Sequence, residues 1–119
     1  MKKKVLICDD ELGIRESLKL ILGDHYNLIL VDSGEQCLEC LKNSTDIGVV
    51  LLDIKMPQIN GLDLLGEIKK RHPDQKVIIV TGYKSVETAS EAARLGASGY
   101  IVKPFDSQEI LDTVGRNSI

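Results

Sequence analysis

Short runs of apolar residues recur along the chain, separated by segments in which the apolar residues repeat with a helical period. The runs consist mainly of β-branched residues and leucine, which is typical of parallel strands that are buried on both faces. We therefore predict strands at residues 5–8, 28–31, 49–52, 77–80 and 100–102.

The segments between these runs carry the start and stop signals of helices. Ser33 and Gln36 have the spacing of a capping box at the start of a helix. Another helix is expected to begin after Gly61 and to end before Pro73, because the residue that precedes a proline disfavours helical backbone. The helical residues predicted to face the core are Ile14, Leu18, Ile21, Leu22, Leu38, Leu41, Leu62, Leu65, Ile68, Ile110 and Val114.

The alternation of about five strand–helix units predicts an α/β fold, in which a parallel sheet lies between two layers of helices. The length of 119 residues suits a single domain, and no repeat or linker interrupts the pattern. We therefore expect one domain over residues 1–119.

Polar residues follow four of the predicted strands at the point where each strand ends. Asp9-Asp10 follows the first strand, Asp53 the third, Thr81 the fourth and Lys103 the fifth. Ligands of open α/β sheets bind at the carboxyl ends of the strands, so these side chains are expected to converge. The second strand contributes no such residue and is therefore placed at an edge. With right-handed crossovers, this favours the strand order 2-1-3-4-5 of a flavodoxin-like, doubly wound sandwich.

Such a cluster of carboxylates would repel itself unless a proton or a cation joined it. Oxygen ligands at a compact site favour a hard ion, and Mg²⁺ is the usual one where phosphate chemistry occurs. The carboxylate of Asp53 could attack phosphorus and form an acyl phosphate. Lys103 could contribute a positive charge to one phosphoryl oxygen, and the hydroxyl of Thr81 could donate a hydrogen bond to another.

Each of these residues also has a purely structural interpretation. Asp10 could cap the first helix, Thr81-Gly82 could form a turn, and a single lysine before a proline carries little information. Asp53 has no comparable packing explanation, because it is a carboxylate directly after an apolar strand. The prediction of a phosphoryl site therefore depends on the joint pattern.

With these motifs in the same order, the chain resembles the receiver domain of bacterial two-component response regulators, including the chemotaxis regulators. The resemblance extends from Lys4 to about Val114. Its motifs are residues 5–10, residues 51–57, Asn60-Gly61, residues 80–82, Gly96-Ala97 and residues 103–105.

The resemblance implies specific roles at the predicted site. Asp53 corresponds to the phosphoryl acceptor, and Lys103 corresponds to the lysine that contacts the phosphoryl group. Asp10 and Asp53 would bind Mg²⁺ directly, together with the backbone carbonyl of Lys55, and Asp9 would act through water. The side chain of Lys55 has no fixed role in the family. Near the acyl phosphate it could hinder an attacking water or pair with the acidic cluster, which predicts slow hydrolysis.

The resemblance also implies a conformational switch. Thr81 corresponds to the switch hydroxyl and Tyr100 to the switch aromatic. Tyr100 could also be a half-buried strand aromatic, and the two interpretations can hold together. The Lys103–Pro104 bond is expected to be cis, as in the relatives. Ile14 could contact the phosphodonor protein, or it could simply continue the apolar face of its helix.

The expected partners are a sensor histidine kinase or a histidine phosphotransfer protein as donor, and an unidentified output domain or protein. The resemblance also implies a possible homodimer through the fourth helix, fifth strand and fifth helix. The chain is expected to catalyse only its own phosphorylation and dephosphorylation. With a net charge of −3 it lacks the basic character of a nucleic-acid-binding domain. Its apolar runs are too short for a signal peptide or a membrane span, so a cytoplasmic location is expected.

Other functions and sites fit the sequence less well. Cys37 and Cys40 form a C-x-x-C pair within a helical pattern, which favours packing over a redox or zinc site. A phosphohydrolase of the haloacid-dehalogenase type would need D-x-D after the first strand, and a nucleotide-binding flavodoxin-like protein would need a phosphate-cradling loop there. Asp9-Asp10-Glu11 fits neither requirement. A histidine phosphocarrier would be all-helical, which the strand pattern excludes.

Overall fold

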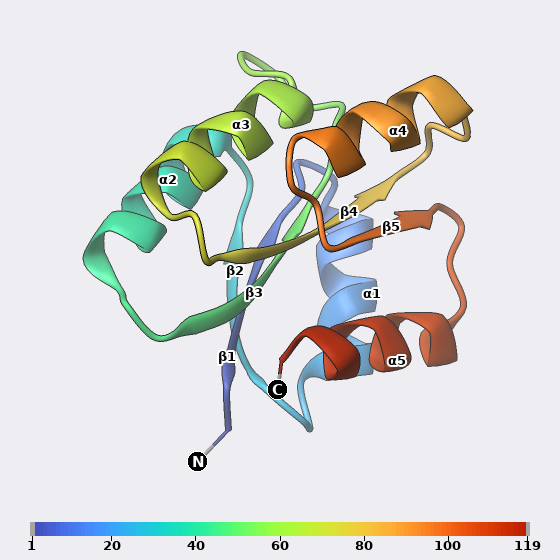
Figure 1. Cartoon of the computed structure of the whole chain (residues 1–119). Coiled ribbons are helices and arrows are strands. Elements are labelled where there is room, and N and C mark those ends of the chain that lie inside the picture. Colours follow the sequence, from blue (N-terminus) through green and yellow to red (C-terminus); the bar gives the residue numbers. More distant parts are fainter. Residues whose placement is uncertain (1, 119) are drawn as a thin grey trace.

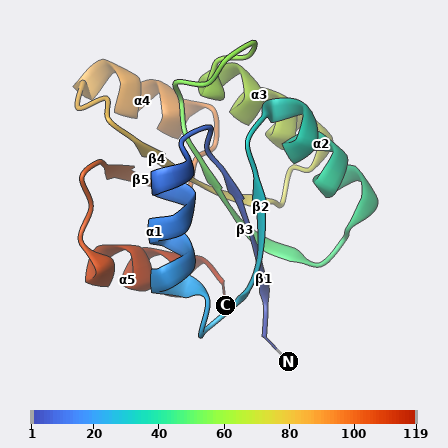
Figure 2. The same ribbon diagram turned by 180° about the vertical axis from the view of Figure 1, so that it is seen from behind.

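Five parallel strands form one sheet, in the order β2-β1-β3-β4-β5, in a computed structural model that describes residues 2–118. Helices cover both faces of this sheet (Figures 1 and 2). The predicted fold class and strand order are therefore confirmed. In chain order, the elements are β1 (Lys4–Cys8), α1 (Leu12–Leu22), β2 (Asn27–Val31), α2 (Gly34–Asn43), β3 (Ile47–Leu52), α3 (Gly61–Arg71), β4 (Lys76–Thr81), α4 (Val86–Arg94), β5 (Gly99–Val102) and α5 (Ser107–Asn117).

The register of the strands brings the polar residues to one edge. Cys8 at the end of β1 lies opposite Leu52 at the end of β3, so the residues that follow them, Asp9 and Asp53, emerge side by side. Thr81 pairs with Val102, and the backbone N–H of Lys103 donates to the carbonyl of Thr81 at 2.8 Å.

The sheet separates two apolar cores. On one face, β-strand residues pack against α2, α3 and α4, and on the other face they pack against α1 and α5 (Figure 1). Strand β3 serves both cores, because its side chains alternate between the two faces. Val50 and Leu52 belong to the first core, whereas Val49 and Leu51 belong to the second.

Side-chain caps begin four of the five helices, as their sequences favour. Ser33 accepts from the backbone N–H of Gln36, while the Gln36 side chain accepts from Asp32 rather than from Ser33. The first bond is the one that a capping box predicts. The second differs, because the Gln36 side chain bonds the backbone N–H of the residue before Ser33. Helix α1 is the exception, since its N-cap residue Glu11 makes no side-chain capping bond.

The three residues of α3 that were predicted to face the core, Leu62, Leu65 and Ile68, all pack against it. Leu64 is fully buried in α3 together with Leu65 and Ile68, whereas Leu62 is only partly buried against the same core. The apolar stripe of α3 therefore includes Leu64 in addition to the predicted residues.

Among the described residues, none of the helices combines the length and the apolar character that crossing a bilayer requires.

Candidate functional site

Asp9 and Asp53 are buried at the carboxyl end of the sheet, with 2% and 3% of their surfaces exposed. Each uses one carboxylate oxygen to fix its orientation. Asp9 Oδ1 accepts from the backbone N–H of Glu11 at 3.0 Å, and Asp53 Oδ1 accepts from that of Ile54 at 2.8 Å. The second oxygen of each aspartate remains available to a cation.

The ammonium group of Lys103 is one cation that these oxygens bind. Its Nζ lies 2.9 Å from Asp9 Oδ2, 3.2 Å from Asp53 Oδ2 and 3.3 Å from Glu11 Oε1. The Lys103 side chain is only 12% exposed, so these interactions are poorly screened by water. One ammonium group therefore faces three carboxylates, which leaves a net negative charge at the site.

The pKa values at the cluster show how burial and pairing compete. Burial raises the pKa of Asp9 above its usual value, although the hydrogen bond from Lys103 partly opposes this. Burial alone would lower the pKa of Lys103, but its hydrogen bond to Asp9 and the charges of Asp9 and Asp53 raise it. Lys103 therefore stays protonated at neutral pH.

Four acidic residues of this cluster are arranged as a metal site would require. Asp9, Asp10, Glu11 and Asp53 each offer one carboxylate oxygen, and these oxygens lie within 4.8 Å of one another. Hard oxygen donors at this spacing suit Mg²⁺.

Glu11 was not among the predicted site residues; its position directly after Asp9-Asp10 was the only signal for it. Asp10 is exposed and is not the N-cap of α1, so the structure does not support the capping interpretation.

A cavity of about 220 Å³ opens beside Asp53. Thr81 is fully buried at its wall, whereas Lys55 is exposed at its mouth. The cavity has room for a phosphoryl group between a carboxylate, an ammonium and a hydroxyl. The residues that line it are Glu11, Asp53, Lys55, Thr81, Gly82, Tyr83 and Lys103.

Tyr100 is not part of this cavity, but it is linked to it through the backbone of Tyr83. The Tyr100 hydroxyl donates to the Tyr83 carbonyl at 2.7 Å, and the Tyr83 N–H points to Thr81 Oγ1 at 3.5 Å. Tyr100 itself is half-buried against the core beneath α2, α3 and α4. Tyr83 thus connects the two residues that were assigned to the switch.

The remaining predicted residues lie outside the acidic cluster. The Lys103–Pro104 peptide bond is cis. Ile14 is half-buried against the core beneath α1 and α5, which leaves part of its side chain at the surface of α1. Cys37 is completely buried and Cys40 partly buried, and burial raises the pKa of the Cys40 thiol, as suits packing residues.

Comparison with known proteins agrees with this geometry. Residues 5–115 match the family model of the response regulator receiver domain. The response regulator protein FleR of Pseudomonas aeruginosa is 40% identical over the whole chain, which spans 25% of FleR.

Solved structures of receiver domains superpose over nearly the full chain. A CheY-like response regulator receiver domain from Methanospirillum hungatei has a TM-score of 0.91 and 32% identity, covering 98% of this chain and 93% of its own. The response regulator TrrA of Thermotoga maritima, solved with Mg²⁺ and BeF, has a TM-score of 0.85 and 36% identity. The match covers 96% of this chain and 97% of the TrrA chain.

Proposed function

Because this chain belongs to the response regulator receiver domain family, we propose that Asp53 is the residue through which it accepts a phosphoryl group in two-component signalling. The observation that carries this assignment is the position of Asp53. It is buried, one of its oxygens is fixed by the Ile54 N–H, and the other lies beside Lys103 at an open cavity.

The transfer needs a nucleophile, charge stabilisation and a donor. In this proposal an oxygen of Asp53 attacks phosphorus, the bond from phosphorus to the donor's imidazole nitrogen breaks, and that nitrogen retains the electron pair. Lys103 and the Thr81 hydroxyl then each bind a phosphoryl oxygen. The cavity beside Asp53 supports these roles, because Lys103 and Thr81 both line it.

The residues present fit a magnesium ion. Asp10, Asp53 and the backbone carbonyl of Lys55 would hold it, with Asp9 acting through water, and Glu11 is close enough to assist. The ion supplies positive charge that offsets repulsion between the carboxylates and the incoming phosphoryl group. The solved TrrA structure, which contains Mg²⁺ and BeF, supports this expectation by similarity.

The donor is proposed to be a phosphohistidine on a sensor kinase or a phosphotransfer protein, with the exposed part of Ile14 among its contacts. The switch would run from Thr81 through Tyr83 to Tyr100, and from there to the surface of α4, β5 and α5. We propose that an output domain or protein, and a second copy of the chain in a homodimer, bind at that surface. The chain spans a quarter of the length of FleR. We also propose a cytoplasmic location and a single domain over residues 1–119.

Incubation with acetyl phosphate and Mg²⁺, followed by measurement of the intact mass, tests the proposal. The wild-type chain should gain the mass of one phosphoryl group, and Asp53→Ala should gain none. Asp63→Ala, which removes an exposed aspartate of α3, is the matched control and should be labelled like the wild type. Labelling of Asp53→Ala, or sustained hydrolysis of generic phosphoesters by the wild type, would overturn the assignment.

A further inference from the structure

The segment that joins Asp53 to α3 is held by apolar side chains at intervals along its length. Ile54 and Met56 are buried in the core beneath α2, α3 and α4, and Ile59 is partly buried against the same core. Lys55 lies between the first two of these residues, with its side chain exposed. The backbone of Lys55 is therefore placed by its neighbours and not by its own side chain.

Gln58 gives this segment a strained turn. Its φ angle is 74°, and the backbone N–H of Ile59 donates to the carbonyl of Pro57 at 2.9 Å. These are the features of a three-residue γ-turn whose central residue has left-handed backbone, which is rare for a residue other than glycine. Such a conformation raises the free energy of the backbone and persists only where the surrounding structure holds it. The turn at Gln58 therefore needs a support beside it.

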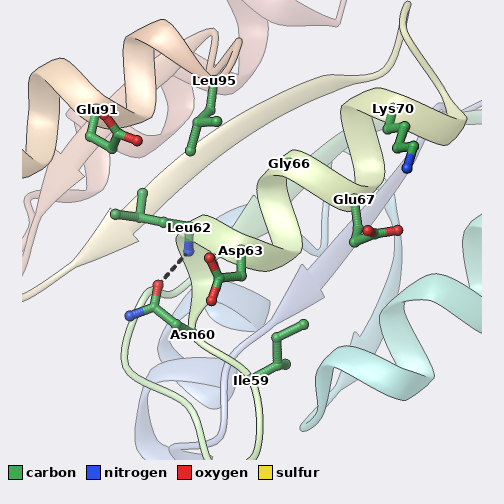
Figure 3. A pocket seen from close by; sticks show the side chains of 9 residues that line it. All are labelled: Ile59, Asn60, Leu62, Asp63, Gly66, Glu67, Lys70, Glu91 and Leu95. Atoms are coloured by element: carbon green, nitrogen blue, oxygen red, sulfur yellow. Dashed lines mark hydrogen bonds between the residues drawn. The ribbon is translucent and has the colours of Figure 1, made fainter.

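Ile59 provides this support at the N-terminal end of α2. A Cβ atom added to Gly34, the first residue of α2, would lie only 2.5 Å from Ile59 Cγ2. Nonbonded carbon atoms keep about 3.5–4.0 Å apart, so the Ile59 methyl group occupies the space that a side chain at position 34 would need. Figure 3 shows Ile59 and Leu95 of α4 on opposite sides of α3, with Ile59 on the side where α2 lies.

Met56 reaches the same end of α2 through a sulfur contact. Met56 Sδ lies 3.7 Å from Sγ of Cys8, the last residue of β1. Cys8 Sγ in turn lies 3.4 Å from the carbonyl oxygen of Ser33, which is the N-cap of α2. Met56 and Ile59 therefore both connect the segment after Asp53 to the start of α2.

The hydrogen bonds of this segment leave the Lys55 carbonyl free. The Ile54 N–H donates to Asp53 Oδ1 at 2.8 Å, and the Ile54 carbonyl accepts from the Gly61 N–H at 2.7 Å. Both backbone groups of Ile54 are thus used. Within residues 2–118, none of the backbone N–H groups in loops, turns and caps donates to the carbonyl of Lys55. That oxygen is available to a cation.

We propose that Ile59 is a positioning residue for the metal site, which holds the Gln58 turn by packing on Gly34 and thereby keeps the Lys55 carbonyl in place for Mg²⁺. The inference rests on the proposed function, in which this carbonyl and the aspartates of the acidic cluster would hold the ion. A ligand that is already fixed loses less conformational freedom on binding, which raises affinity. Ile59 does not line the cavity beside Asp53, so its effect on the ion would be indirect.

Titration of MgCl₂ into the ¹⁵N-labelled chain tests this role, with the amide signals of residues 9–10 and 53–55 as the report. Ile59→Ala removes the methyl group that packs on Gly34, and Gly34→Ala places a Cβ atom against that methyl group. Each substitution should raise the Kd for Mg²⁺ at least about threefold. NMR observes the folded molecules separately, so a substitution that only lowers stability would leave this Kd unchanged.

The double variant Gly34→Ala/Ile59→Ala tests the contact itself. The methyl group added at position 34 would take part of the volume that Ile59 Cγ2 leaves, so the double variant should bind Mg²⁺ more tightly than either single variant. Non-additive effects of this kind are expected for residues in contact. Losses that simply add, or a wild-type Kd in either single variant, would overturn the proposal.

Ile29→Ala is the matched control. Ile29 of β2 is also an isoleucine that is partly buried against the core beneath α2, α3 and α4. Its replacement should lower the free energy of unfolding but leave the Kd for Mg²⁺ at the wild-type value. A rise in Kd equal to that of Ile59→Ala would show a general softening of the core and would also overturn the proposal.

The wild-type chain separates this inference from the proposed function. If it gains a phosphoryl group at Asp53 and binds Mg²⁺, while the Ile59 and Gly34 variants bind the ion equally well, only the positioning role is wrong. If the wild-type signals do not respond to MgCl₂, the proposed metal site is wrong, and the role of Ile59 with it.

Discussion

The Nζ atom of Lys103 lies 3.2 Å from Oδ2 of Asp53, although the two residues are 50 positions apart in the chain. Strand register creates this contact, because Lys103 follows β5 and Asp53 follows β3 on the same edge of the sheet. The lysine also bonds Asp9 and Glu11, so its positive charge offsets the repulsion between these neighbouring carboxylates.

Replacing Lys103 by methionine should destabilise the chain strongly when Mg²⁺ is absent. Asp9 and Asp53 would then be buried without their ammonium partner, which costs about 3 kcal/mol in the free energy of unfolding. Addition of Mg²⁺ should recover much of this loss by replacing the missing charge. Urea denaturation in EDTA and in MgCl₂ measures both values.

Lys19→Met is the control for this experiment, since Lys19 is an exposed lysine on α1. It should change the unfolding free energy by less than about 0.5 kcal/mol in either buffer. A Lys103→Met loss that is the same with and without Mg²⁺ would show that the lysine stabilises by packing, not by charge.

Lys55→Ala should shorten the lifetime of the acyl phosphate. The exposed side chain of Lys55 lies at the mouth of the cavity beside Asp53, where it can obstruct the approach of water. We expect hydrolysis to accelerate about threefold to tenfold, which corresponds to roughly 1 kcal/mol in the activation barrier. The decay of the phosphorylated mass with time measures this rate, and Lys42→Ala on α2 should leave it unaltered. An unchanged rate in Lys55→Ala would disprove the role.

Thr81→Ala should separate phosphorylation from the response of Tyr100. Loss of one hydrogen bond to a charged phosphoryl oxygen should slow labelling about tenfold, given about 1.5 kcal/mol for such a bond. The substitution would also remove the hydroxyl to which the Tyr83 N–H points, and with it the contact that links the site to Tyr83 and Tyr100. Chain labelled with fluorotyrosine should show a phosphorylation-dependent ¹⁹F shift of Tyr100 in the wild type.

In phosphorylated Thr81→Ala, that shift should be absent. Tyr100→Phe leaves the ring but removes the hydroxyl that donates to the Tyr83 carbonyl, and it assigns the resonance. If the Tyr100 signal moved equally in both proteins, Thr81 would not connect the site to the aromatic ring.

Gly61→Ala should be among the most damaging small substitutions in the chain. Its new Cβ would lie 2.1 Å from the Asp53 carbonyl oxygen and 2.5 Å from Ile54 Cα, so the backbone must move. Overpacking of this kind costs about 3 kcal/mol. Gly13→Ala, in open space on α1, should instead stabilise by about 0.5–1 kcal/mol. Urea denaturation of the two variants, compared with the wild type, provides the test.

Much of the fold could be predicted because the sequence repeats one simple unit. Apolar runs bounded by polar residues located the five strands, and the lack of chemistry after the second strand indicated its edge position. The convergence of Asp9, Asp53, Thr81 and Lys103 follows from strand direction alone, since the carboxyl ends of parallel strands share one edge.

Other features depend on side-chain conformation and helix rotation, which the sequence pattern does not specify. Glu11 reaches Lys103 through a flexible side chain across 92 positions of sequence, so adjacency to Asp10 was its only signal. The deeper burial of Leu64 than of Leu62 depends on how α3 is rotated on the sheet. The link through Tyr83 is made by backbone atoms, which the identity of a residue does not reveal.

The alternation of side chains along β3 makes the sheet a partition within the molecule. Val49 and Leu51 pack under α1 and α5, whereas Val50 and Leu52 pack under α2, α3 and α4. The strands therefore separate a substitution that remodels one helical layer from the side chains of the other layer. During evolution, the helices on one face of the sheet can therefore acquire new contacts with partners while the helices on the other face keep their existing contacts.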